Sequence, residues 1–172
     1  MERKGLWGLV ALAGMVVAGC AAGPSEPEPN PLGPPPPESA QADVLWQYLE
    51  AANYRRFWVP ETAKDPGIHR GRSGHGPLIR SYVNKVADKA RPLGGEPLPP
   101  GSVVVLENYT HEPHLHSIDV MAKINGHNEA THDWAFYRFA PNGGVKVSDI
   151  AARTAAREEN RGCIHCHRRT AE

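Results

Sequence analysis

The run Cys163-Ile164-His165-Cys166-His167, close to the C-terminal end of the 172-residue chain, constrains the fold more than any other feature. Two thiols three residues apart on one helical turn can add across the two vinyl groups of a single haem. The histidine directly after the second cysteine then lies beneath the iron as an axial ligand. On this interpretation the C-terminal end of the chain carries a covalently attached haem.

Zinc binding and thiol redox chemistry are the competing interpretations of two cysteines at this spacing. A zinc site needs a second pair of ligands, and the third cysteine of the chain, Cys20, lies far away near the N-terminus. A thioredoxin-like pair would lie early in a domain, between a strand and a helix, whereas this pair lies at the far end. We therefore predict one covalently attached haem c, bound through Cys163 and Cys166, with His167 as the metal ligand.

The N-terminus resembles an export signal. Three charged residues, Glu2-Arg3-Lys4, precede an apolar run from Leu6 to Val17 that is too short to span a bilayer. Small residues followed by Cys20 resemble the lipobox of bacterial lipoproteins, and an ordinary secretory signal is the alternative. We predict a signal peptide at residues 1–19, lipid on Cys20, and a periplasm-facing location on the inner or outer membrane.

The segment after Cys20 is rich in proline. Eight of the 17 prolines of the chain lie between Pro24 and Pro37, and this stretch has no apolar periodicity. Extended polyproline II at roughly 3.1 Å per residue could hold a domain about 50–60 Å from the membrane. Residues 20–39 are therefore predicted to form the lipidated cysteine and its tether, and residues 40–172 one folded domain.

The charge balance excludes one class of partner. The chain has 19 Lys and Arg residues against 19 Asp and Glu residues, so it presents no basic field for nucleic acid. Apolar residues make up 40% of the chain, which is enough for a core. Nucleic acid is therefore not an expected partner.

The pattern of apolar residues predicts two helices followed along the chain by several strands. Apolar residues recur at helical spacing over residues 44–57 and again over residues 79–90. Three strands are expected from β-branched, alternating or aromatic runs, at residues 103–106, 118–124 and 134–139. A last helix is expected over residues 149–159. This order predicts an α+β fold, in which helices flank an antiparallel β-sheet and the haem c attachment motif follows at the C-terminus.

Several short stretches, taken in order, resemble the cytochrome P-460 and cytochrome c′-beta family. They are Asn53-Tyr54-Arg55-Arg56-Phe57-Trp58, His75-Gly76, Ile79-Arg80-Ser81-Tyr82-Val83-Asn84, Pro99-Pro100-Gly101-Ser102-Val103-Val104-Val105, Met121-Ala122-Lys123, Asp133-Trp134-Ala135-Phe136-Tyr137 and the terminal motif. The resemblance covers most of residues 40–168 and implies a mono-haem c domain.

The sequence departs from cytochrome P-460 proper at one position. That protein carries a lysine cross-linked to its haem where this chain has Leu106. The resemblance therefore implies the c′-beta branch, in which a pentacoordinate haem binds nitric oxide or carbon monoxide in an apolar pocket. Leu106, Phe57 and Phe136 are the candidates for the distal pocket, whereas Lys85 and Lys123 are the nearest alternative lysines.

Other polar residues have two interpretations each. His111, His114 and His116 could bind copper or zinc, or reach the iron as a sixth ligand, whereas a solvated loop is the simpler interpretation. Arg80 is predicted to bind the cofactor by pairing with a haem propionate, because buried carboxylates need cationic partners.

These observations predict a mono-haem c-type cytochrome that binds nitric oxide or a related small ligand at an apolar site. A membrane-tethered electron-transfer cytochrome is the alternative. A haem-dependent oxidoreductase acting on hydroxylamine or nitric oxide comes third, because Leu106 removes the cross-link. No catalytic residue is identified. A redox partner protein and a second copy of the chain remain open as protein partners.

Overall fold

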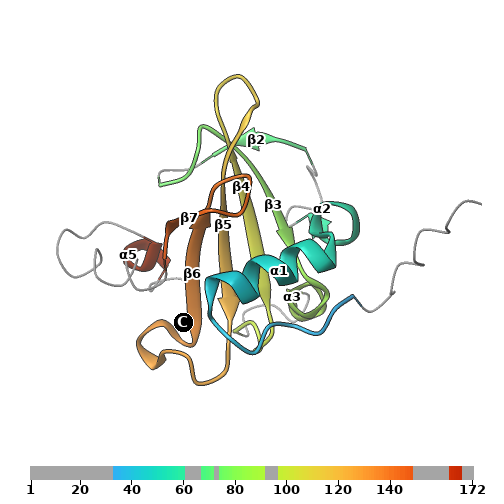
Figure 1. The fold of residues 1–172 in the computed structure, drawn as a ribbon, viewed down its shortest axis with the longest axis vertical. Coiled ribbons are helices and arrows are strands. Elements are labelled where there is room, and N and C mark those ends of the chain that lie inside the picture. Colours follow the sequence, from blue (N-terminus) through green and yellow to red (C-terminus); the bar gives the residue numbers. More distant parts are fainter. Residues whose placement is uncertain (1–32, 61–66, 72–73, 92–96, 149–162, 168–172) are drawn as a thin grey trace, which may run out of the picture.

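The computed structural model describes residues 33–60, 67–71, 74–91, 97–148 and 163–167 (Figure 1). Their strands form one antiparallel sheet in the order β1-β3-β4-β5-β6-β7, with β2 also pairing with β3. The strands are β1 (Val59–Pro60), β2 (His69–Arg70), β3 (Leu78–Val83), β4 (Val103–Tyr109), β5 (Leu115–Lys123), β6 (Trp134–Phe139) and β7 (Val145–Val147). The predicted α+β class with an antiparallel sheet is confirmed.

The first face of the sheet carries the main core. Helix α1 (Ala42–Ala52) crosses it (Figure 1) and buries Leu45, Tyr48 and Leu49. The strand residues of this α1 face are Tyr82, Val103, Val105, Ile118, Val120, Ala122, Ala135, Tyr137 and Phe139. Because side chains alternate along a strand, the residues between them point to the other side of the sheet.

The second face is where the C-terminal helix α5 (Cys163–His167) packs. Ile164 of α5 forms a buried cluster with Trp134 and Phe136 of β6. Val104 and Met121 are partly buried against the same cluster. We call this side of the sheet the α5 face.

The helix predicted over residues 79–90 is wrong in its first half. That half is β3, which pairs with β4 along its whole length, and only Lys85–Ala90 are helical, as α3. Asn84 separates the two because its Oδ1 accepts a hydrogen bond from the Ala87 N–H at 3.1 Å and caps α3. A strand buried on both faces carries apolar residues on both sides, so the spacing of Ile79 and Tyr82 matched that of a helix.

The other predicted elements agree better with the structure. The first helix, α1, ends at Ala52. The next residue, Asn53, has a left-handed backbone with φ of 42°, which separates α1 from α2 (Tyr54–Phe57). The strand predicted over residues 134–139 is confirmed as β6. The strand predicted over 118–124 is confirmed as β5, which begins earlier, at Leu115. The strand predicted over 103–106 is confirmed as β4, which extends to Tyr109. The helix expected over 149–159, the signal peptide, Cys20 and most of the tether lie outside the described residues. None of the described helices combines the length and the apolar character needed to cross a membrane.

A buried carboxylate holds α2 against the sheet. Glu107 of β4 is 1% exposed and accepts hydrogen bonds from the Tyr54 hydroxyl at 2.8 Å and the Tyr109 hydroxyl at 2.6 Å. Arg55 Nε donates to the same side chain at 2.5 Å. Burial raises the pKa of the Tyr54 and Tyr109 phenols, and the carboxylate raises it further. The two phenols therefore keep their protons and donate them to Glu107.

Candidate functional site

Helix α5 brings the paired-cysteine motif onto the sheet. Ile164, the apolar residue after the first cysteine, is 8% exposed and packs on Trp134 and Phe136. Cys163 is half-buried at the edge of the same cluster. The side chains of His165 and Cys166 lie outside the described part of the structure. Burial of Ile164 thus orients one turn of helix so that at least Cys163 and His167 lie beside the α5 face.

His167, the predicted axial ligand, lies close to two other rings. The centre of its imidazole is 5.9 Å from that of the Phe136 ring and 6.1 Å from that of the His75 ring. The second contact is edge-on, with an interplanar angle of 69°. The sequence analysis quoted His75 only as part of the family resemblance, so its place beside His167 is a finding of the structure.

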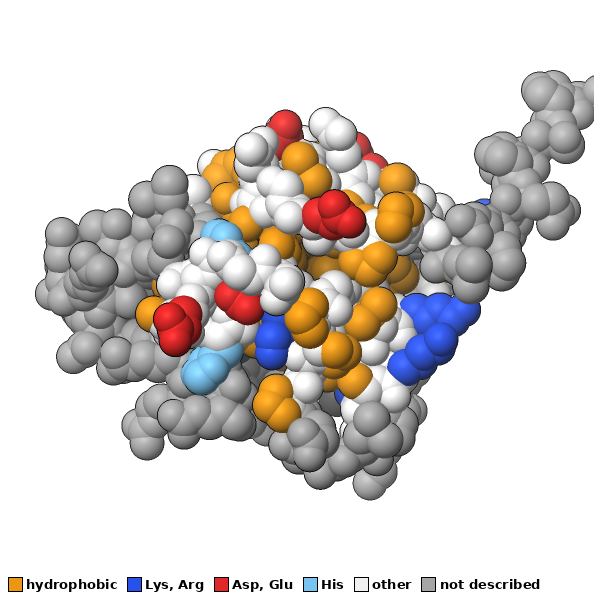
Figure 2. Space-filling view, turned by 90° about the horizontal axis from the view of Figure 1, so that it is seen from below, with side chains coloured by type: hydrophobic (Ala, Val, Ile, Leu, Met, Phe, Trp, Pro, Cys, Tyr) orange, Lys and Arg blue, Asp and Glu red, His pale blue; other side chains and the backbone are white. Residues whose placement is uncertain are grey.

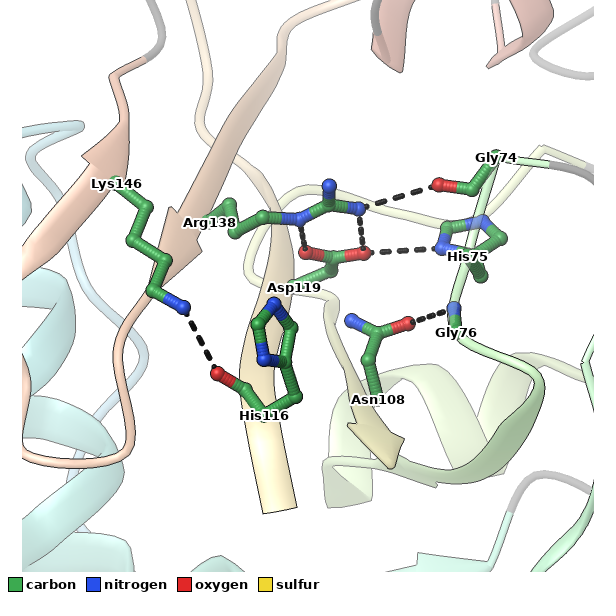
Figure 3. Close-up of polar contacts among 8 residues, drawn as sticks. All are labelled: Gly74, His75, Gly76, Asn108, His116, Asp119, Arg138 and Lys146. Atoms are coloured by element: carbon green, nitrogen blue, oxygen red, sulfur yellow. Dashed lines mark hydrogen bonds and ion pairs between the residues drawn. The ribbon is translucent and has the colours of Figure 1, made fainter. Parts of the chain in front are cut away.

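His75 belongs to a hydrogen-bonded cluster on the α5 face (Figure 3). The carboxylate of Asp119 accepts from Arg138 Nε at 2.5 Å and from Arg138 Nη2 at 2.7 Å. His75 Nδ1 lies 2.9 Å from Asp119 Oδ2. Burial disfavours the charge on Asp119, yet the hydrogen bonds from Arg138 and His75 outweigh it and lower the pKa of this carboxyl to about 2.

The same cluster reaches the motif and the neighbouring loop. The hydrogen bond with Asp119 raises the pKa of Arg138, and Cys163 contributes in the same direction. Asn108 Oδ1 accepts from the Gly76 N–H at 2.9 Å, which ties the loop of His75 to β4. The buried Asn108 amide nitrogen makes no hydrogen bond of ordinary geometry among the described residues, but it lies close enough to Asp119 to help lower the pKa of that carboxyl.

Two of the three predicted pocket residues share a face with His167. Leu106 is half-buried and lies opposite Ser81 of β3 and Asp119 of β5, so it points to the α5 face. Phe136, 3% exposed, is on that face too. Phe57 lies instead in α2 and is 49% exposed. The structure therefore brings Leu106 and Phe136, but not Phe57, to one side of the sheet.

Arg80 lies on the opposite side of the sheet from His167. It is paired with Glu107 in the β3–β4 register, and its guanidinium carbon lies 5.2 Å from the centre of the Tyr82 ring on the α1 face. Its role as a propionate partner remains a prediction that the described contacts do not support. Among the described residues, Arg138 is an arginine that does interact with the motif, through Cys163.

The histidines between β4 and β5 are exposed. His111 and His114 lie in the connecting loop and His116 at the start of β5, where its backbone oxygen accepts from Lys146 Nζ at 2.9 Å (Figure 3). In the described part of the chain, no three His, Cys, Asp or Glu side chains lie close enough together to hold a metal ion. Metal binding by these histidines stays a prediction.

An open cavity of about 570 Å³ lies at the end of the sheet that Figure 2 views, where charged, histidine and hydrophobic side chains adjoin one another. Its lining residues are Pro97, Lys123, Asn125, Gly126, Glu129, His132 and Asp133. Lys123 Nζ lies 5.8 Å from the centre of the Trp134 ring, so the cavity adjoins the α5 face. Lys85, the other lysine considered, is exposed at the start of α3.

Sequence reasoning missed Asp119 and Arg138. Each is one charged residue within an alternating strand, and such residues ordinarily face solvent. They are direct partners in the β5–β6 register, so opposite charges at matching positions of neighbouring strands were the available signal.

The residues present fit a haem. The α5 face offers an apolar surface for a porphyrin, made by Val104, Leu106, Met121, Trp134 and Phe136. The half-buried Cys163 and His167 are at its edge. Thiol, imidazole and apolar surface together are the donor set of a c-type attachment.

Comparison with known proteins agrees with this chemistry. A protein-family model described as cytochrome P460 matches residues 52–172, more than two thirds of the chain. The matched region contains all seven strands and α5. A search of curated proteins finds no match to the chain.

Proposed function

The chain belongs to the cytochrome P460 family, whose members are haem-binding cytochromes, and on that premise we propose that it is a lipid-anchored, periplasm-facing mono-haem c protein. Cys163 and Cys166 would hold the haem and His167 would bind the iron. The open axial position would take nitric oxide or a related small ligand. When bound, the haem supplies an iron that binds diatomic ligands and exchanges an electron.

The single observation that carries the ligand-binding proposal is the group of apolar side chains on the α5 face, formed by Val104, Met121, Trp134 and Phe136 with Leu106 beside them. Aliphatic and aromatic side chains exclude water and offer no proton to a bound ligand. Asp119, beside Leu106 in the register, has its oxygens held by Arg138 and His75. Its low pKa makes it a poor proton donor, so the face favours ligand binding over proton-coupled oxidation.

Titration of the reduced protein with carbon monoxide tests this proposal. We expect a five-coordinate ferrous spectrum that shifts on carbon monoxide addition, with no turnover of hydroxylamine in the presence of an artificial electron acceptor. Leu106→Phe should slow carbon monoxide association by filling the site, whereas Val59→Phe, at an exposed position in β1, should leave it unchanged. Rapid hydroxylamine turnover would contradict the proposal and favour the enzyme.

A tethered electron-transfer cytochrome is the second candidate, and one observation favours it. A nitrogen–metal bond is about 2 Å long, so two imidazoles on one iron have ring centres about 6 Å apart, which is close to the separation of His75 and His167. A low-spin spectrum that does not respond to carbon monoxide would establish this alternative.

Anchoring at Cys20 is tested separately. The motif predicts that the mature chain begins at Cys20 and carries lipid there. Mass spectrometry of the membrane fraction would show this, and cleavage at another position or an unmodified Cys20 would contradict it.

A further inference from the structure

We propose that the surface formed by α2 and the β1–β2 edge of the sheet binds the anionic headgroups of a lipid bilayer, as a second membrane contact besides the lipid on Cys20. We call it the edge surface, and its exposed residues are Arg55, Arg56, Phe57, Val59, Ile68 and Arg70. The inference rests on the proposed function in one respect, since lipid on Cys20 is what brings this surface to a bilayer.

The residues of the edge surface follow one edge of the sheet. Strand β4 pairs with β3 along its whole length, so β1 and β2 both lie on the other side of β3. Val59 and His69 pair with positions of β3 that are four residues apart, which is about 13 Å along a strand. Ile68 directly precedes β2, and Phe57 ends α2 two residues before β1. Segments on both sides of residues 61–66 therefore contribute to one surface.

Apolar side chains are unusually exposed on the edge surface. Among the described residues, four large hydrophobic side chains are exposed, and three of them lie here: Phe57 at 49%, Val59 at 38% and Ile68 at 40%. The fourth, Val145, lies in β7 at the opposite edge of the sheet. Single exposed hydrophobic residues are ordinary, but three gathered along one short edge indicate an interaction surface.

The same part of the chain is basic, although the whole chain is neutral. Residues 53–72 contain five Lys or Arg residues against two Asp or Glu residues, whereas the whole chain has 19 of each class. Arg55 is half-exposed and bound to the buried Glu107, while Arg56 and Arg70 are exposed. The guanidinium carbon of Arg56 lies 5.1 Å from the centre of the exposed Phe57 ring.

This combination of groups fits a bilayer surface that carries negative charge. Apolar side chains can enter the region between headgroups and acyl chains, while guanidinium groups pair with lipid phosphates. Figure 2 shows Lys and Arg side chains gathered on the right, the side on which α2 and α3 lie in Figure 1. The charge complementarity therefore favours anionic lipid as the partner of the edge surface.

The place where the N-terminal segment joins the domain favours a bilayer over an acidic protein. The described chain begins at Gly33, and Pro36 packs over Gly101: a Cβ added to this glycine would lie 3.2 Å from Pro36 Cβ and 4.0 Å from Val86 Cγ1 of α3. Asn84, which follows the end of β3 that pairs with β1, donates to Gly101 O at 2.8 Å. In Figure 1 the described chain starts on the right, beside α2 and α3, whereas α5 lies on the left.

The connection to the lipid is short. Only 12 residues separate Cys20 from Gly33, and a segment of this length spans at most about 45 Å. A domain of about 130 residues is about 35–40 Å across. Lipid on Cys20 therefore keeps the domain within roughly its own diameter of the bilayer, with the side that carries the edge surface nearest to it and α5 turned away.

The experiment measures the binding of the unlipidated holoprotein to vesicles. The mature chain that begins at Ala21, exported with a cleavable secretory signal, is mixed with vesicles of phosphatidylglycerol and phosphatidylcholine in equal parts, or of phosphatidylcholine alone, and sedimented. We expect binding to the anionic vesicles that weakens as the salt concentration rises, and little binding to phosphatidylcholine.

Matched variants locate the contact. Arg56→Gln and Arg70→Gln should each weaken binding to the anionic vesicles by about fivefold, the share of one basic side chain near such a surface. Val59→Ser should weaken it as well. Lys146→Gln and Val145→Ser, which make the same kinds of change at exposed positions of β7, should leave binding unchanged.

Three results would overturn the proposal. The first is equal binding to both kinds of vesicle, or equal losses in the edge-surface variants and the β7 variants. The second is a dimer of the wild type that Val59→Ser converts to a monomer without a change in vesicle binding, because the edge surface would then join two copies of the chain. The third is tighter binding of soluble polyglutamate than of the anionic vesicles, which would indicate an acidic protein partner. Failure of the anchor itself is distinct, since it appears as an unmodified Cys20 in mass spectrometry of the wild type.

Discussion

Replacing Asp119 by Asn should remove an acid-sensitive part of the stability of this protein. The ordinary pKa of an aspartate is 3.8, and in the folded protein the pKa of Asp119 is about 2. At 1.36 kcal/mol per pH unit, this difference is worth roughly 2–3 kcal/mol of folding free energy at neutral pH. The side chain is nearly buried, so little of that value is lost to solvent screening.

The sign follows from the lowered pKa. A carboxyl whose pKa is lower in the folded state binds fewer protons there than in the unfolded state. Its stabilisation is fully present above about pH 4 and is lost as the pH falls from about 4 towards 2. The amide of the Asp119→Asn variant cannot ionise, so the stability of that variant should lack this fall.

Denaturant unfolding followed from pH 6 to pH 2.5 measures the effect. The wild type should exceed Asp119→Asn by roughly 2–3 kcal/mol at pH 6, and the gap should shrink to below about 1 kcal/mol at pH 2.5. Glu112→Gln, at an exposed loop position, serves as the control and should follow the wild type. A gap that does not change with pH would refute the assignment of the Arg138 and His75 hydrogen bonds to a charged Asp119.

Three further perturbations have expected outcomes. Glu107→Gln should lower the free energy of unfolding by about 2–4 kcal/mol, because the buried carboxylate accepts hydrogen bonds from Tyr54 and Arg55. A loss under about 1 kcal/mol in denaturant unfolding would contradict this. Gly143→Ala should lower the melting temperature, since φ is +88° there and a Cβ would lie 2.5 Å from Trp46; an unchanged melting temperature would show that the turn is not constrained. Leu106→Lys should place an amine on the α5 face and shift the Soret band if a cross-link to the haem forms, and a haem that still depends wholly on the two cysteines would exclude that bond.

Much of the sheet could be predicted because its pattern is local. The alternation around Ile118 and the aromatic run from Trp134 predicted strands that the structure confirms, the first from its period of two and the second from residue types that favour strands. The segment from 79 to 83 failed because it is covered on both faces, where apolar residues follow neither period cleanly.

The candidate site also has a part that local sequence predicts and a part that only the fold determines. The terminal motif is local, so its chemistry could be predicted from spacing alone. The contact between His75 and His167, and the ion pair of Asp119 with Arg138, depend on strand register and on a long connection. Arg80 was expected near the cofactor, yet the register of β3 directs its side chain to the α1 face. A shift of one residue along β3 would have directed it to the α5 face, and the sequence alone does not set that register.

The central claim is that one haem is bound covalently through Cys163 and Cys166, and the intact mass of the purified protein tests it most directly. The account predicts that the mature chain, made in a host with c-type cytochrome maturation, is heavier by one haem that acid–acetone does not extract. In the variant with both cysteines replaced by Ala, that added mass should be absent or extractable. A wild-type chain without the added mass, or haem that stays attached in the double variant, would contradict the account.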